Sequence, residues 1–268
     1  MFFKQPAPDF WLLTTNYKLQ TPVISLQHIT KIFNRGKVNE VSALKDVSLE
    51  INKGEFVVMI GSNGSGKTTL LNIIAGVEMC TKGTVMINGN NVTALPEHKR
   101  SKWIARVFQN PFDGTAPDLS ILDNFRLAAI RTQSKKISIG INSAFKKKVQ
   151  EKIAMLGMGL ENKINQPIGS LSGGQRQALT LLMSVMDDTN ILLLDEFTAA
   201  LDPKSANVVL SLADMLIKNY GLTALFVTHN LKDAHQYGNR LIQMQEGKIL
   251  RDVEKENLQL QNMYQWFE

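Results

Sequence analysis

The segment Gly61-Ser62-Asn63-Gly64-Ser65-Gly66-Lys67-Thr68 carries the most specific chemical pattern in this sequence. Glycines let the backbone approach a ligand closely, so that a row of N–H groups can surround phosphate oxygens at a helix N-terminus. In loops of this kind the lysine reaches the β- and γ-phosphates, and the hydroxyl after it holds Mg²⁺. We therefore predict that this loop and Thr69, which follows it, bind a nucleoside triphosphate with Mg²⁺.

The residues that must position this loop fit the same role. Residues 56–60 are a short apolar run typical of a buried strand, and residues 69–75 predict the first turns of a helix. A second apolar run, 191–194, ends in Asp195 and Glu196. Ligands of open α/β sheets bind at such strand ends, so we expect Asp195 to support Mg²⁺ and Glu196 to polarise an attacking water.

Composition limits the class of protein. The chain has 268 residues, of which 44% are hydrophobic and 20% charged, which indicates one or two globular domains. Its net charge of +6 suits a polyphosphate ligand or an anionic membrane surface and is too weak to indicate nucleic acid. The single cysteine, Cys80, excludes an internal disulfide and fits a reducing compartment. Since no apolar run approaches about 18 residues and no signal peptide is evident, we expect an intracellular chain without a membrane span.

Strand and helix patterns alternate along most of the chain, which predicts an α/β fold. Strands are expected over 23–29, 47–51, 104–108 and 224–227, with hairpins joining 84–87 to 92–93 and 241–244 to 248–250. Helices are expected over 96–102, 119–130 after Asp118, 145–156, 175–186, and 203–219 with Asp202 as N-cap. Residues 134–140 indicate a basic turn. The helices within about 112–170 suggest a helical subdomain inserted into an α/β core.

With Leu171-Ser172-Gly173-Gly174-Gln175, the sequence resembles the ATP-binding subunits of ABC transporters, over roughly residues 23–250. This segment matches that family's signature motif residue for residue. The resemblance implies a P-loop NTPase core of mostly parallel sheet flanked by helices, with an antiparallel β subdomain and an inserted α-helical subdomain. It further implies ATP and Mg²⁺ as cofactors, and two subunits paired head to tail. Residues 172–174 would then face a γ-phosphate held on the partner's loop.

Four more positions match the family. Gln109 matches its glutamine loop, which touches Mg²⁺; Asp202 ends a loop that crosses the dimer interface. His229 matches a histidine at the γ-phosphate, and Phe33 matches an aromatic that stacks on adenine. Singly, Phe33, Gln109 and His229 are more often structural than functional; their order and spacing favour function. The departures affect loop shape rather than reacting groups: Phe197 in place of proline, Ala199 where serine is frequent, and Gln177-Ala178-Leu179 in place of an arginine-containing run.

Three functions stay open at this point: the motor of an ABC transporter, a soluble ABC ATPase acting on DNA or the ribosome, and a scaffold without turnover. One set of motifs without a coiled-coil insertion favours the transporter, and Glu196 with His229 favours turnover. The resemblance then implies a peripheral protein at the cytoplasmic face of the membrane, with permease subunits and a substrate-binding protein as partners. The segment 106–123 is similar to import ATPases for amino-acid-like or nucleoside-like solutes, with an exporter as the alternative.

The ends of the chain and one internal segment carry further expectations. Residues 1–22 are apolar but rich in proline, so they form an extension packed on the domain, a disordered arm, or an arm that contacts a partner or membrane. The ATPase domain is expected over 23–255, followed by a tail over 256–268. Apolar residues within 112–125 exceed what one short helix buries, which predicts a groove for a helix of the membrane subunit: Phe112, Pro117, Leu119, Ile121, Leu122 and Phe125.

Overall fold

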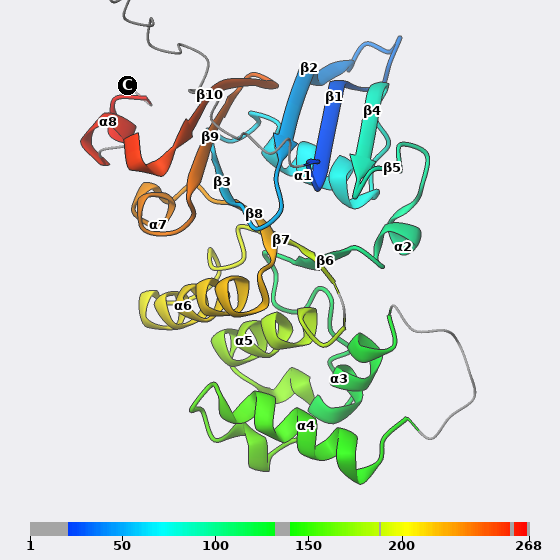
Figure 1. Ribbon diagram of the computed structural model, residues 1–268, viewed down its shortest axis with the longest axis vertical. Coiled ribbons are helices and arrows are strands. Elements are labelled where there is room, and N and C mark those ends of the chain that lie inside the picture. Colours follow the sequence, from blue (N-terminus) through cyan, green and yellow to red (C-terminus); the bar gives the residue numbers. More distant parts are fainter. Residues whose placement is uncertain (1–20, 132–139, 188, 258–259, 267–268) are drawn as a thin grey trace, which may run out of the picture.

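The computed structural model describes residues 21–131, 140–187, 189–257 and 260–266. It has an upper lobe of two sheets around one helix and a lower lobe of helices (Figure 1). Residues 1–20 of the predicted extension over 1–22, most of the predicted basic turn, and residues 258–259 and 267–268 of the tail lie outside the described residues.

A six-stranded sheet in the order β10-β9-β3-β8-β7-β6 forms the centre of the molecule. All neighbouring pairs are parallel except β9 with β10, which form the predicted hairpin. β3, β7 and β8 are buried at every residue, as expected for parallel strands covered on both faces. The strands span β3 (Phe56–Ile60), β6 (Ile104–Val107), β7 (Ile191–Asp195), β8 (Thr223–Val227), β9 (Arg240–Gln245) and β10 (Lys248–Glu254).

A four-stranded antiparallel sheet, in the order β2-β1-β4-β5, forms the top of the upper lobe. Its strands are β1 (Ile24–Phe33), β2 (Val41–Ile51), β4 (Lys82–Ile87) and β5 (Asn90–Asn91). Asn88 and Gly89 take φ angles of 48° and 73° at the predicted hairpin turn. The expected strand over 92–93 is wrong: the Thr93 hydroxyl, rather than a strand carbonyl, accepts the hydrogen bond from Val85 N–H at 2.9 Å.

Helices cover both faces of the central sheet. α1 (Lys67–Ala75) packs between the two sheets, whereas α5 (Gly173–Ser184), α6 (Pro203–Tyr220) and α7 (Leu231–Gln236) cover the opposite face. The lower lobe adds α3 (Ile121–Ala129) and α4 (Ser143–Ala154), with one-turn helices η1 (Leu160–Asn162) and η2 (Ile168–Ser170). Three short elements complete the described chain: α2 (Glu97–Arg100), η3 (Lys255–Asn257) and α8 (Leu260–Tyr264).

The segment around α3 differs from its prediction in two ways. The N-cap of α3 is Ser120, whose hydroxyl accepts a hydrogen bond from Asp123 N–H, so the helix begins at Ile121 and not directly after Asp118. Ile121 and Phe125 are fully buried and Leu122 is 7% exposed, because α3 packs against both α4 and α5. The predicted groove therefore keeps three of its six apolar members exposed: Phe112 at 51%, Leu119 at 42%, and Pro117.

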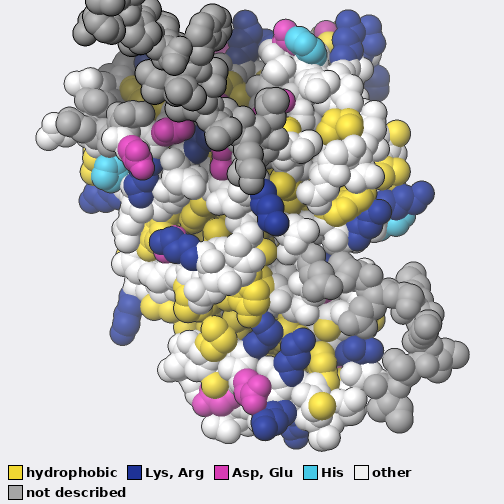
Figure 2. Space-filling model, in the orientation of Figure 1, with side chains coloured by type: hydrophobic (Ala, Val, Ile, Leu, Met, Phe, Trp, Pro, Cys, Tyr) yellow, Lys and Arg dark blue, Asp and Glu magenta, His cyan; other side chains and the backbone are white. Residues whose placement is uncertain are grey.

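The surface of the lower lobe mixes charge with scattered apolar residues. Figure 2 shows Lys and Arg side chains spread over this lobe, with hydrophobic patches between them. Within the described part of the chain, no helix combines the length and apolar character needed to span a bilayer.

Candidate nucleotide site

The predicted phosphate loop connects β3 to α1 and is shaped by its glycines. Gly66 sits at the N-cap of α1 with φ 102°, and a Cβ there would lie 2.7 Å from the Ala43 carbonyl oxygen, so only glycine fits. No side chain caps the first turn of α1, which leaves its N–H groups for a ligand to engage. Ser65 Oγ is buried in the loop with no hydrogen-bond partner among the described residues. These features fit a bound polyanion.

Lys67 lies at the centre of this loop. Its ammonium donates hydrogen bonds to the carbonyl oxygens of Gly61 at 2.8 Å and Ser62 at 3.0 Å. Burial lowers the pKa of Lys67, and the nearby carboxylates of Glu196 and Asp195 oppose that shift. The lysine is thus a pre-placed cation beside two acids.

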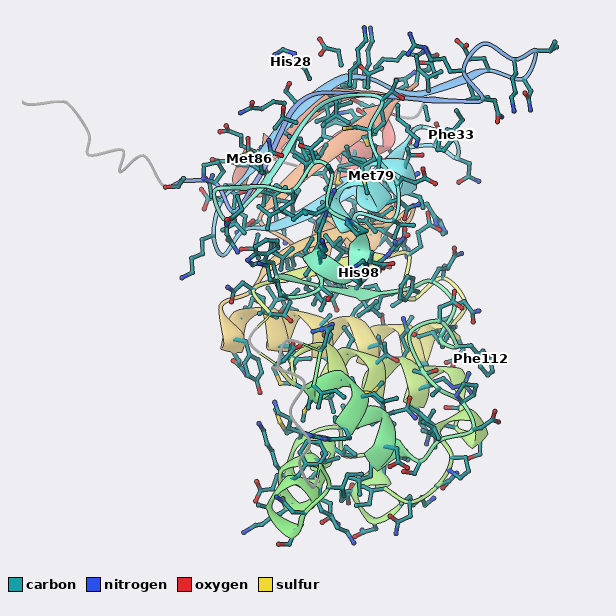
Figure 3. The ribbon with its side chains drawn as sticks, turned by 90° about the vertical axis from the view of Figure 1, so that its right-hand side faces the viewer. His28, Phe33, Met79, Met86, His98 and Phe112 are labelled. Atoms are coloured by element: carbon teal, nitrogen blue, oxygen red, sulfur yellow. The ribbon has the colours of Figure 1, made fainter. Side chains whose placement is uncertain are left out.

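Seven of the predicted nucleotide-binding residues, together with Glu196, line one cavity of 340 Å³. Phe33, at the end of β1, is half-buried, and the Lys31 ammonium lies 4.6 Å from its ring centroid. Figure 3 shows Phe33 in the upper lobe, on the same side of the molecule as Phe112 in the lower lobe. The cavity lining includes Phe33, Asn63, Gly64, Gly66, Lys67, Thr68, Thr69 and Glu196.

Glu196 links this cavity to a second one of 270 Å³. The second cavity is lined by His229 as well, and His229 Nδ1 lies 3.4 Å from Glu196 Oε2. Glu196 adopts φ 43°, a left-handed conformation that a non-glycine residue holds only with support. Support comes from its N–H, which donates to Val227 O at 2.9 Å, and from Phe197, which is fully buried edge-on against Phe226. A carboxylate fixed beside an imidazole can accept a proton from water.

Two charged residues at this site were missed by sequence reasoning. Arg106 of β6 donates a hydrogen bond to Asp195 Oδ2 at 2.7 Å. Asp233 of α7 lines the cavity of His229; burial raises its pKa, and the charge of His229 opposes that shift. A basic residue inside the otherwise apolar run 104–108 was the one available signal for Arg106.

Several other predicted residues line neither cavity. Gln109 is exposed just after β6. Leu171 precedes α5, and Ser172 is its N-cap: Ser172 Oγ accepts a hydrogen bond from Gln175 N–H at 3.3 Å, and Gln175 Oε1 accepts one from Ser172 N–H at 3.2 Å. Asp202 is the exposed N-cap of α6, and its hydrogen bonds with Ser205 lower its pKa. None of these residues lines the cavity around Lys67.

A metal ion in this site would not be coordinated by protein carboxylates alone. No cluster of three or more His, Cys, Asp or Glu side chains suited to a metal occurs in the residues that the structure describes. Thr68 offers an exposed hydroxyl on the cavity wall, and Asp195 ends the adjoining β7. This sparse oxygen set suits Mg²⁺, which is commonly held by one or two protein oxygens together with substrate phosphates.

Comparison with known proteins relates the chain to one protein family. A family described as "ABC transporter" matches residues 44–199. The chain is 37% identical to a tyrosine transport ATP-binding protein of Clostridioides difficile, over 92% of this chain and 99% of that protein. It is 33% identical to the phosphonates import ATP-binding protein PhnC of Lactobacillus acidophilus, over 88% of this chain and 91% of that protein.

Two further similarities extend the comparison. The chain is 34% identical to the spermidine/putrescine import ATP-binding protein PotA of Bacteroides thetaiotaomicron, with 87% of this chain covering 47% of that protein, about half its length. Among solved structures, the dimeric post-hydrolysis state of the ATP-binding cassette MJ0796 bound to ADP and Pi superposes with a TM-score of 0.75 at 31% identity. That match covers 88% of this chain and all of the other.

Proposed function

This chain belongs to the ABC transporter family and is an ATPase, and we propose that it hydrolyses ATP in a site shared between two copies to power solute import. The observation that carries the proposal is the position of Glu196, which lines both the cavity of the phosphate loop and the cavity of His229.

The phosphate loop and Phe33 bind the nucleotide in this proposal. Backbone N–H groups of residues 61–69 hold the phosphates, Lys67 leaves the Gly61 and Ser62 carbonyls to bind the β- and γ-phosphates, and Phe33 stacks on the base. Thr68, Asp195 and Gln109 would hold Mg²⁺, which neutralises charge on the phosphate oxygens. The Gln109 contact requires a movement, because Gln109 does not line the cavity.

Glu196 and His229 carry the proton chemistry. Glu196 orients the attacking water and accepts its proton, while His229, 3.4 Å away, binds near the γ-phosphate. Glu196→Gln preserves shape and hydrogen bonding, so nucleotide affinity should be retained and turnover should fall by about 10²–10⁴-fold. Near-normal turnover by this variant would assign the base to another residue.

The second half of the site comes from a partner copy in this proposal. Ser172, Gly173 and Gln175 stand exposed or half-exposed at the N-terminal end of α5, and none of them lines the cavity of their own copy's phosphate loop. A helix N-terminus is suited to an anion. In a head-to-tail pair, Leu171 to Gln175 of each copy would close over the other copy's γ-phosphate, with Asp202 at the interface.

Mixing two inactive variants tests this sharing. Lys67→Ala removes nucleotide binding, whereas Ser172→Arg keeps binding and blocks the partner's γ-phosphate. In a head-to-tail pair of one variant with the other, one composite site loses both residues and one keeps both. The 1:1 mixture should therefore regain part of the wild-type activity that neither variant has alone, at most one site per dimer. Activity equal to the wild type, or none above the separate variants, would refute the shared site.

Import of a small solute is the transport function that the relatives support best. The similar proteins are named for tyrosine transport and for import of spermidine/putrescine and phosphonates. We infer an amino-acid-like or nucleoside-like solute, a permease at the membrane and a substrate-binding protein outside it. Uptake of labelled tyrosine in cells with and without the gene tests the first candidate. Accumulation of the solute after gene deletion would instead indicate an exporter.

The exposed apolar residues of the lower lobe are the proposed permease contact. Phe112 and Leu119 are 51% and 42% exposed, and Arg176 stacks on the Phe112 ring with its guanidinium carbon 3.6 Å from the ring centroid. Leu119→Glu should leave basal ATP hydrolysis intact and release the chain from membranes. Val208→Glu, at a residue of α6 that is 42% exposed, is the matched control. If Leu119→Glu stays bound and coupled, the permease docks elsewhere.

A further inference from the structure

Arg106 is a charged residue within a strand that is otherwise apolar. Its neighbours Ile104, Ala105 and Val107 are buried in the core, and the Arg106 side chain itself is only 11% exposed. The carboxylate of Asp195, also 11% exposed, accepts a hydrogen bond from its Nη2 at 2.7 Å. Burying both charges costs free energy that only good pairing offsets.

The sheet register brings the two side chains to one face. Arg106 pairs with Leu193 of β7, and Asp195 lies two residues farther along that strand, so all three share a face. Leu193 packs in the core layer that includes α1, the helix that begins with Lys67. Arg106 thus contacts Asp195 across a sequence separation of 89 residues.

Contacts around the guanidinium indicate that stability alone does not account for Arg106. Its guanidinium carbon lies 4.8 Å from the Phe108 ring centroid, which limits its orientation. Its Nε is buried and makes no hydrogen bond within the described chain, which is unfavourable. Well-packed apolar residues in place of a buried ion pair often leave a protein equally or more stable. A buried arginine at this place with one donor unsatisfied points to a role at Asp195.

We propose that Arg106 is a positioning residue for Asp195. It engages Oδ2, fixes the rotation of the carboxylate, and so presents the rest of the group to the cation that accompanies the nucleotide. Among the described residues it is the one side chain that donates a hydrogen bond to Asp195. The inference rests on the proposed function, in which Asp195 supports Mg²⁺.

The test compares nucleotide binding with and without the metal. Calorimetric titration of ATP into the full chain, in Mg²⁺ and then in EDTA, gives the factor by which Mg²⁺ improves affinity. Arg106→Met should reduce that factor by about 10-fold, the effect expected when a partner of a metal ligand is lost. Its affinity in EDTA should match the wild type, and Arg106→Lys should recover part of the metal effect. A merely structural role would lower both affinities or neither.

A control at Asp195 separates the two levels of the proposal. Asp195→Asn should also lose the Mg²⁺ effect. If Asp195→Asn loses it and Arg106→Met keeps it, the positioning role is wrong and the proposed function stands. If Asp195→Asn keeps the Mg²⁺ effect, Asp195 does not support the metal. Both the Mg²⁺ role of Asp195 in the proposed function and the positioning role of Arg106 then fail. If thermal unfolding shows that Arg106→Met does not fold, Arg106→Gln is measured in its place. Retention of the full Mg²⁺ effect by Arg106→Gln would likewise refute the positioning role of Arg106.

Discussion

Phe33→Ala tests how the base of the nucleotide is bound. The ring is half-buried on the cavity that holds Lys67 and Thr68. The Lys31 ammonium beside it is itself held by Glu78 Oε2 at 2.7 Å and by Met79 O at 2.9 Å. Stacking of a base on an aromatic side chain contributes about 1–3 kcal/mol. Its loss should raise the Kd for ATP by about 5- to 150-fold.

Calorimetric titration measures the Kd, and urea unfolding checks the fold. Phe33 does not belong to the buried core, so its truncation should cost well below the about 3–5 kcal/mol of a buried phenylalanine. Phe33→Trp should keep the affinity, and because stacking discriminates poorly between bases, GTP should bind nearly as well as ATP. An unchanged Kd in folded Phe33→Ala would refute the stacking role.

Three further predictions concern the scaffold of the site. Arg100→Met should lower the free energy of unfolding, measured in urea, by about 3 kcal/mol. The buried guanidinium donates hydrogen bonds to four main-chain carbonyls around the end of α1, those of Ile73, Ile74, Leu95 and Thr93. A change below about 1 kcal/mol would contradict this prediction. Gly66→Ala should abolish ATP binding because its Cβ would meet the Ala43 carbonyl at 2.7 Å, whereas Gly64→Ala, with nothing within 4 Å, should cost only about 1–2 kcal/mol of left-handed strain. Burial raises the pKa of Asp233 above its ordinary value of 3.8, so the ionised carboxylate destabilises the fold at neutral pH and this destabilisation is absent below pH 3.8. Asp233→Asn should therefore raise the free energy of unfolding at pH 7. A rise in stability that persists at acid pH would refute this cause.

The sequence was sufficient to predict features that depend on short spacing. The phosphate loop needs only a strand, glycines and a helix in succession, and the structure has β3, the loop and α1 in that order. The buried run of β7 and the cap of α6 by Asp202 are equally local. The fold class followed from the same pattern and from the resemblance, and the solved relatives confirm it.

Contacts between distant segments could not be predicted in this way. Arg106 and Asp195 are 89 residues apart, and only the parallel register of β6 and β7 brings them together. Leu122 and Phe125 were expected to face a partner but are buried, because α4 and α5 cover α3 from two sides.

Local irregularities obscured other elements. β1 was predicted too short since its register shifts after Leu26 and Gln27, and His28 takes φ 53°, which breaks the alternation of a strand. α7 (Leu231–Gln236) was missed because it is too short to show a helical period.

In the proposed function, two copies of the chain enclose ATP between Lys67 of one and Ser172 of the other. The most direct measurement is the molar mass of Glu196→Gln in solution, by light scattering, with Mg²⁺ and either ATP or ADP. Because this variant should bind ATP without hydrolysing it, the mass should double from the monomer with ATP and stay at the monomer with ADP. If Glu196→Gln binds ATP with wild-type affinity yet remains a monomer at ATP concentrations far above its Kd for ATP, the shared site would be contradicted.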